Sequence, residues 1–399
     1  MRLGVAAALV GGELVDGDVE VVDERVATLG LGAPSGSRIA APGFVDLQVN
    51  GYAGVDFSAP GADGYEVARA ALLAGGVTAF QPTIVTAEVD SMLASLAQMP
   101  APDLGSQGVP VGRSVAAASG PRVIGAHLEG PFISPSRRGA HDPSAICPPD
   151  LAILRALLDG GTPTKASLTA EVTGAVGASL PNCAVTQVTL APELPGALEL
   201  IDELVARGIT VACGHTDADA AAAHLAFDHG ANAVTHLFNA MRRPTPRDPG
   251  IAFAALARDD VFVSLIVDGN HLADDTVRTA WRAAGDRVVL ISDAVAAAGA
   301  PDGDYALGGA VPTHSGGGVV RTTDGALAGS TLSMLDAVRN AHALGIPLAA
   351  ALRAATETPA RMARRPDLGR IEPGARADLV VLDDSLELQQ VLLDGAICG

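Results

Sequence analysis

Four residues that can bind a metal ion or move a proton lie at the ends of four apolar runs. Glu129 ends RVIGAHLE, His215 ends GITVACGH, His236 lies in ANAVTHLF, and Asp293 lies in RVVLISDA. Two histidines and a carboxylate suit Zn²⁺ or a similar divalent ion and leave a position for water, whose pKa the ion lowers to about 7. A single histidine at a strand end is usually a core or capping residue, but four such groups together indicate a metal site.

The chemistry of these ligands does not fix the ion. Zn²⁺ is the expected metal, and Fe²⁺, Mn²⁺ and Co²⁺ accept the same donors. Asp293 has two interpretations. It is either a proton acceptor outside the ligand set, or the N-cap of a helix after ISDA, a position that favours Asp.

A pair of amides ends the stretch GFVDLQVNG, where many metal hydrolases carry His-x-His. Gln48 and Asn50 are two residues apart, so they share one face if the stretch is a strand. Neutral amides are weak ligands for such an ion, so they are expected to hydrogen-bond the water or a neighbouring ligand instead. Lys165, the only lysine, lies away from the strand ends. The sequence therefore predicts one metal ion, and neither a Schiff base nor a lysine bridging two metals.

An arginine-rich loop, MRRPTPRDPG, follows the run that carries His236. It supplies Arg242, Arg243 and Arg247 to a chain with a formal net charge of −19. The loop is either a solvated surface segment or a clamp for a phosphate or carboxylate, for which arginine is suited by its bidentate geometry.

The elements that would position these residues alternate between strand-like apolar runs and Ala/Leu-rich helical stretches. Eight such units lie between Pro42 and about Ala363, which favours a (β/α)8 barrel with its site at the C-terminal ends of the strands. Short β-like runs dominate both chain ends, and residues 105–120 and 162–183 are interpreted as loops or insertions. The region after Asp293 is predicted to be a flexible Gly-rich loop followed by a hairpin.

Composition limits the partners. The chain has 399 residues, of which 48% are hydrophobic and 18% charged, so it can bury one large core or two smaller ones. Its acidic balance argues against nucleic-acid binding, and no apolar run reaches the roughly 20 residues of a membrane span. The four cysteines are scattered, which favours reduced thiols. The apolar N-terminus runs directly into β-like segments, so we expect a cytoplasmic chain rather than a signal peptide.

Longer motifs carry a resemblance to a known family. HLEGPF, RRGAHDP, VTLAPE, CGHTDA, THLFNAM, DGNH and ISDA occur in an order and spacing similar to those of the N-acetylglucosamine-6-phosphate deacetylases of the amidohydrolase superfamily. The resemblance implies a TIM-like barrel of residues 42–363. It also implies a small β-sandwich domain built from residues 1–41 and 364–399. The implied reaction is hydrolysis of the acetamide of N-acetyl-D-glucosamine 6-phosphate.

The resemblance also implies roles for individual residues. The implied metal ligands are Glu129, His215 and His236, the implied acid/base is Asp293, and the residue that polarises the carbonyl is His141. The implied substrate contacts are Ala140, His141, Asn239, Ala240, Arg247, His271, Leu327, Ala328 and Gly329. Arg247 and His271 resemble phosphate contacts that are partly donated across a homodimer interface. Relatives with the Gln-x-Asn pair work with one metal ion.

Three alternatives remain at this point. The substrate could be N-acetylgalactosamine 6-phosphate or another acylamino sugar, because the epimers differ at one hydroxyl. A catalytically silent sugar-phosphate-binding protein on the same fold would be expected to have lost one of the four strand-end residues, and all four are present. A nucleobase or hydantoin amidohydrolase would leave the arginine loop unexplained. The stretch 162–183 is longer than the family pattern, which bears on the sugar preference.

Overall fold

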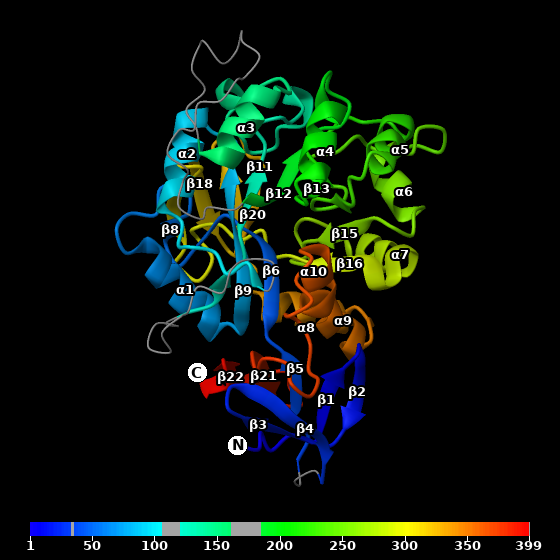
Figure 1. Ribbon diagram of the computed structural model, residues 1–399. Helices are drawn as coiled ribbons and strands as arrows, with labels where there is room; N and C mark the ends of the chain where they lie inside the picture. The colour runs from blue at the N-terminus through cyan, green and yellow to red at the C-terminus, as the bar shows by residue number, and fades with distance from the viewer. Residues whose placement is uncertain (33–35, 106–119, 161–184, 399) are drawn as a thin grey trace.

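A parallel barrel forms the centre of the molecule in the computed structural model, which describes residues 1–32, 36–105, 120–160 and 185–398 (Figure 1). Eight parallel strands follow one another around the barrel, as the sequence predicts. They are β6 (Phe44–Val49), β9 (Val77–Val85), β11 (Ala126–Glu129), β12 (Val185–Leu190), β13 (Thr210–Cys213), β14 (Ala233–Val234), β15 (Phe262–Leu265) and β16 (Val288–Leu290). The (β/α)8 prediction is confirmed.

The helices cover the outside of this barrel. They are α1 (Gly64–Ala74), α2 (Val89–Gln98), α3 (Leu151–Asp159), α4 (Ala197–Ala206), α5 (Ala220–Asp228), α6 (Gly250–Leu256), α7 (Asp274–Ala284), α8 (Met334–Ala343), α9 (Leu348–Ala355) and α10 (Glu357–Met362), with 3-10 turns at Pro135–Arg137, Pro143–Ala145 and Gly285–Arg287. Local chemistry sets their ends. For example, the Asp150 carboxylate accepts hydrogen bonds from the N–H groups of Ala152 and Ile153 at the start of α3, and Gly160, with φ of 75°, ends it.

One predicted strand is divided into two. RVIGAHLE forms β10 (Arg122–Val123), which pairs with β9, and then β11. Gly125 lies at the break with φ of 107°, and a Cβ there would lie 2.1 Å from Thr186 Oγ1. The close approach of the next strand therefore requires glycine at the break.

The last seam of the barrel joins β6 to the segment after β16. Val49 and Ala294 form a parallel bridge, and the Asp293 N–H donates to the Gln48 carbonyl at 3.0 Å. A short β-ribbon, β7 (Gly51–Tyr52) with β8 (Val55–Asp56), follows directly. The two ends of the barrel sequence thus meet beside the predicted acid/base.

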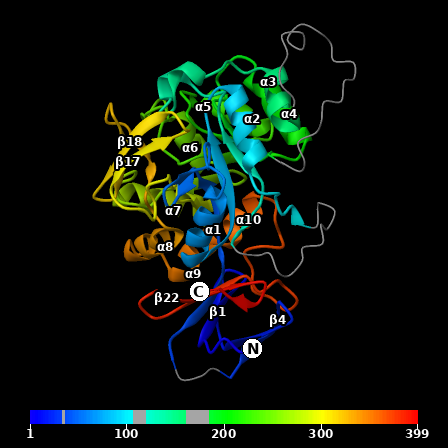
Figure 2. The same ribbon diagram turned by 90° about the vertical axis from the view of Figure 1, so that its left-hand side faces the viewer.

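Both chain ends build a small β-sandwich below the barrel (Figures 1 and 2). Its six-stranded sheet has the order β2 (Glu13–Asp16), β1 (Ala7–Val10), β5 (Ile39–Pro42), β21 (Leu379–Leu382), β22 (Leu388–Leu393) and β23 (Ala396–Ile397). The hairpin of β3 (Asp18–Val22) and β4 (Arg25–Leu31) forms the second layer.

Alternation along β21 explains how the sheet has two buried faces. Leu379 and Val381 belong to the core of the sandwich, whereas Val380 and Leu382 belong to the large core of the barrel. On the barrel side, α9 packs against β1 and β2. The domain limits at residues 41/42 and 363/364 stay a prediction.

The region after Asp293 differs from its prediction. It forms a four-stranded antiparallel sheet, β17 (Gly303–Leu307), β18 (Val311–Gly316), β19 (Val319–Thr322) and β20 (Leu327–Ser330), so the expectation of a flexible loop and one hairpin was wrong. The glycines that suggested flexibility occupy the tight turns, for example Gly317 and Gly318 with φ of 60° and 80°. Leu307, Val320 and Ala328 of this sheet form a core with Val85, Ala140, Val295 and Ala297.

Several predictions fall outside the described residues. These are Lys165, Cys183, the whole stretch 162–183 and residues 106–119 of the stretch 105–120. Within the described ranges, no helix is long and apolar enough to cross a membrane.

Candidate metal centre and active site

The four predicted strand-end residues converge at the C-terminal face of the barrel. Glu129 is the last residue of β11, and His215, His236 and Asp293 lie two to three residues beyond β13, β14 and β16. The three residues that follow strands have left-handed backbones, with φ of 48°, 32° and 49°. Such conformations are unfavourable for residues other than glycine and cluster at functional sites.

Glu129, His215 and His236 present three donor atoms to one point. Glu129 Oε1 lies 3.1 Å from His215 Nε2 and 3.0 Å from His236 Nε2, and the two nitrogens are 3.1 Å apart. All three side chains are buried. Nitrogen and oxygen donors at this spacing can reach one divalent ion at the usual bond length of about 2.0–2.2 Å. The donor set therefore fits the metal that the sequence predicts.

Hydrogen bonding and charge prepare these ligands. His215 Nδ1 lies 3.0 Å from the Arg137 carbonyl, so this nitrogen carries the proton and Nε2 is free to bind a metal. Burial alone would raise the pKa of Glu129, but its hydrogen bonds with His215 and His236 hold that pKa well below its usual value. Glu129 is thus a carboxylate at neutral pH.

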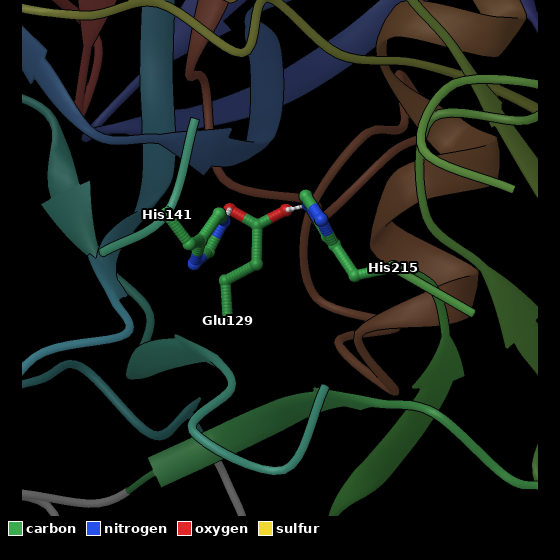
Figure 3. A group of neighbouring side chains, drawn as sticks. All are labelled: Glu129, His141 and His215. Carbon is green, nitrogen blue, oxygen red and sulfur yellow. Dashed lines mark hydrogen bonds and ion pairs between the residues drawn. The ribbon is translucent and has the colours of Figure 1, made fainter. Parts of the chain in front are cut away.

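His141 lies on the other side of Glu129 and forms an alternative triad with Glu129 and His215 (Figure 3). Its Nε2 is 3.9 Å from Glu129 Oε2, and its Nδ1 accepts a hydrogen bond from the Thr86 N–H at 3.3 Å. The proton must therefore be on Nε2, where it faces the cluster. Burial and the neighbouring His215 lower the pKa of His141 to about 3. A neutral N–H donor suits polarisation of a carbonyl better than metal binding.

Asp293 faces the cluster and caps no helix, because the residues after it form none; the N-cap interpretation is wrong. Its Oδ1 accepts hydrogen bonds from Asn50 Nδ2 at 2.7 Å and from Gln48 Nε2 at 3.1 Å. Burial and the charge of Glu129 raise its pKa to about 6. A carboxyl group with a pKa near neutrality can both accept and return a proton.

Gln48 also donates from Nε2 to Glu129 Oε1 at 3.0 Å. Gln48 therefore links the predicted ligand Glu129 to the predicted acid/base, as expected for an amide that hydrogen-bonds a neighbouring ligand, whereas the Asn50 side chain bonds only Asp293 among the described residues.

The predicted sugar contacts lie on two sides of this cluster. Asn239 donates to the carbonyl of His236 at 3.3 Å, and Ala240 has φ of 50°. Gly329 of β20 packs so tightly that a Cβ would lie 2.7 Å from the Asp293 carbonyl oxygen, which brings Leu327, Ala328 and Gly329 beside the site. Ala140 and His141 line a separate cavity of about 310 Å³ with Thr86.

The arginine loop divides into two kinds of residue. Arg242 is held by ion pairs with Asp217 and Asp248 at 3.5 and 2.6 Å. Arg243 and Arg247 are exposed and form no ion pair with any described residue. Arg247 is therefore free to bind an anion, whereas Arg242 stabilises the loop.

His271 pairs through Nδ1 with Asp268 Oδ2 at 2.8 Å and lines a cavity of about 570 Å³ with Phe238 and Pro244. Burial and Glu129 raise the pKa of Asp293, and His271 is among the groups that oppose this rise, so His271 lies within electrostatic range of the site. No contact links Arg247 or His271 directly to Glu129 among the described residues.

Sequence reasoning missed Thr86, which fixes the tautomer of His141, and the buried pair Asp46 and Ser292. Asp46 could have been found, because it lies two residues before Gln48 and so on the same strand face. The Thr86 contact is made by a backbone N–H and has no signal in the sequence.

Comparisons with known proteins identify the family of the chain. Residues 39–398 match the amidohydrolase family profile. The chain is 37% identical over 398 residues to the N-acetylglucosamine-6-phosphate deacetylase of Mus musculus, covering 97% of this chain and 90% of that protein. It is 34% identical over 366 residues to the N-acetylgalactosamine-6-phosphate deacetylase of Escherichia coli O157:H7, covering 91% and 88%.

A solved structure shares the whole architecture. It is a mutant of N-acetyl-D-glucosamine-6-phosphate deacetylase from Mycobacterium smegmatis in complex with N-acetyl-D-glucosamine-6-phosphate. It is 35% identical with a TM-score of 0.85 and covers 100% of this chain and 99% of its own. The family profile, the relatives and the fold thus agree, and the chain belongs to the amidohydrolase family, among its N-acetylglucosamine-6-phosphate deacetylases and their relatives.

Proposed function

We propose that the chain hydrolyses the acetamide of N-acetyl-D-glucosamine 6-phosphate to D-glucosamine 6-phosphate and acetate. The observation that carries the proposal is the placement of Asp293 against the Glu129, His215 and His236 cluster, with Gln48 bonded to both carboxylates. A silent binding protein would not need a proton acceptor held at that position.

In the proposed mechanism, Glu129, His215 and His236 hold one divalent ion, expected to be Zn²⁺ with Fe²⁺, Mn²⁺ or Co²⁺ as alternatives. When bound, the ion activates water near neutral pH and polarises the amide carbonyl. Asp293 takes the proton of the attacking water at Oδ2, because Oδ1 already accepts two amide hydrogen bonds. It then gives that proton to the leaving nitrogen, while the His141 Nε2–H stabilises the carbonyl oxygen.

The sugar phosphate is proposed to lie toward the arginine loop. Arg247 and His271 would contact the phosphate, and Asn239, Ala240 and Leu327–Gly329 the sugar. A homodimer in which one subunit donates phosphate contacts to the other, and a cytoplasmic location, are parts of the same proposal. The free guanidinium of Arg247 supports the phosphate contact.

The test is acetate release by purified protein of measured metal content. The 6-phosphates of N-acetylglucosamine, N-acetylgalactosamine and N-acetylmannosamine are compared by kcat/KM. We expect N-acetylglucosamine 6-phosphate to be preferred. Preference for the galacto epimer would instead favour deacetylation of N-acetylgalactosamine 6-phosphate, the activity in the name of the relative from E. coli O157:H7. Binding of all three without acetate release would contradict an enzymatic function.

We expect about one tightly bound divalent ion per chain. Gln48 and Asn50 hydrogen-bond Glu129 and Asp293, respectively, and amides are weak ligands for such ions. Elemental analysis after dialysis measures the ratio, and two retained equivalents would contradict the expectation. The double variant Gln48→His with Asn50→His should bind a second equivalent.

Arg247→Ala is expected to weaken kcat/KM for the phosphorylated substrate by about 1.5–3 kcal/mol, the range for hydrogen bonds to charged groups. For unphosphorylated N-acetylglucosamine, kcat/KM should differ little between Arg247→Ala and the wild-type chain, because this sugar lacks the phosphate. The matched control is Arg282→Ala, which removes an exposed arginine outside the loop, on α7. Equal losses for both sugars would rule out the phosphate contact. If a partner subunit donates contacts, specific activity should also fall on dilution.

A further inference from the structure

A buried carboxyl group lies beneath the proposed active site at the seam of the barrel. Asp46 on β6 is 0% exposed, and it shares its strand face with Gln48 and Asn50. None of the steps described above uses it. Buried carboxyl groups are costly unless they are hydrogen-bonded, so its contacts indicate what it does.

All of its hydrogen bonds cross or anchor the seam. Asp46 Oδ1 accepts from the Ser292 N–H at 3.2 Å and from the Gln48 N–H at 3.3 Å. Asp46 Oδ2 accepts from the Ser292 hydroxyl, which itself accepts from the Ala294 N–H at 3.1 Å. The residues on both sides of Asp293 are thus tied, directly or through one hydroxyl, to Asp46.

Asp293 needs such support because its backbone is strained. A φ of 49° is unfavourable for a residue other than glycine and persists only where the surroundings over-determine it. The Asp293 N–H donates to the Gln48 carbonyl at 3.0 Å, and the Ser330 N–H donates to the Asp293 carbonyl at 2.8 Å. Asp46 anchors the Gln48 side of this arrangement.

We propose that Asp46, acting through Ser292, is a positioning residue for the reaction: it holds the left-handed backbone of Asp293 and the Gln48 side chain in register with Glu129. The inference rests on the proposed role of Asp293 as the proton acceptor. Among the described residues, Asp46 itself makes no hydrogen bond to Glu129, His215 or His236.

The test compares Asp46→Ala, Asp46→Asn and Ser292→Ala with the wild-type chain. A displacement of about 1 Å at a reacting group can cost 10²-fold in rate. Asp46→Ala should therefore lower kcat by about 10- to 100-fold, with KM within about twofold and metal content unchanged. Asp46→Asn should recover most of kcat, because its Oδ1 accepts the same N–H bonds and its Nδ2 can donate to the Ser292 hydroxyl.

Ser292→Ala is the milder variant and decides the question if Asp46→Ala does not fold. It leaves the two bonds to Asp46 Oδ1 in place, so we expect a smaller loss of kcat, about fivefold or more. The matched control is Thr210→Val, which removes a buried hydroxyl bonded to the Met362 carbonyl at the start of β13, the opposite end of the barrel. Thr210→Val should lower stability without changing kcat.

Crystal structures of the variants provide a readout independent of activity. The Asp293 carboxyl group should be displaced from Glu129 in Asp46→Ala and not in Asp46→Asn. Unchanged kcat or an unmoved Asp293 in Asp46→Ala and Ser292→Ala would overturn the inference. So would an equal loss of kcat in Asp46→Asn and Asp46→Ala. If the wild-type chain releases no acetate, the proposed function fails, and the crystal structures still decide whether Asp46 positions Asp293.

Discussion

Replacing Asp293 by asparagine is expected to lower kcat by about 10² to 10⁴, the usual contribution of general acid–base catalysis. The amide keeps an oxygen that can accept the hydrogen bonds from Gln48 and Asn50, so the seam should remain intact. The amide nitrogen that replaces Oδ2 cannot take a proton from water. The loss should therefore appear in kcat at constant metal content, measured by steady-state acetate release and elemental analysis.

Two controls make this result specific. The thermal unfolding temperature should differ little between Asp293→Asn and the wild-type chain, because the asparagine and aspartate side chains are nearly isosteric. Glu129→Gln should lose metal as well as activity, because it removes the charged ligand. Near-normal turnover by Asp293→Asn would mean that another group activates the water. His141 would be the first to test, although its Nε2, 3.9 Å from Glu129 Oε2, could accept a proton only in the other tautomer, which breaks the hydrogen bond from the Thr86 N–H.

Arg122→Met is expected to lower the free energy of unfolding by about 3–5 kcal/mol, the cost of leaving a buried charge without its partner. Arg122 lies at the start of β10, with its side chain 3% exposed, and its Nε is 3.2 Å from Asp378 Oδ2 in the small β-sandwich. It also bonds Asp103 and Asp394. Burial raises the pKa of Asp378 despite the charge of Arg122, so the carboxyl group depends on this partner.

Urea-induced unfolding of the variants measures the effect. Arg155→Met is the matched control, because Arg155 is 49% exposed in its pair with Glu203; exposed pairs contribute only about 0–1 kcal/mol. Adding Asp378→Asn to Arg122→Met should restore part of the loss, since no unpaired charge then remains buried. A loss for Arg122→Met no larger than that for Arg155→Met would show that the junction does not depend on this network.

The sequence by itself determined the barrel and the residues at its mouth. Apolar runs of strand length alternate with helical stretches, and a parallel barrel brings the C-terminal ends of all its strands to one face. Glu129, His215 and His236 therefore had to be near one another, although they are up to 107 residues apart in sequence. The two-residue spacing of Gln48 and Asn50 placed both amides on one side of β6 for the same local reason.

Only the tertiary structure decided what Asp293 and the Gly-rich region do. Asp is equally suited to cap a helix or to accept a proton, and the choice depends on Asn50, 243 residues away, donating to its side chain. The glycines after Asp293 are compatible with a loop or with tight turns. Packing of Val320 and Ala328 against Val295 and Ala297 made them turns in a sheet.

The orientation of the site side chains could not be predicted from the sequence either. Whether His141 or His236 completes a triad with Glu129 and His215 depends on where each ring nitrogen finds a partner. The backbone N–H of Thr86 occupies His141 Nδ1, which puts the proton on Nε2 and makes that nitrogen a donor. Local patterns report which face a residue occupies, whereas hydrogen bonds between distant segments set the direction, tautomer and charge of the group that reacts.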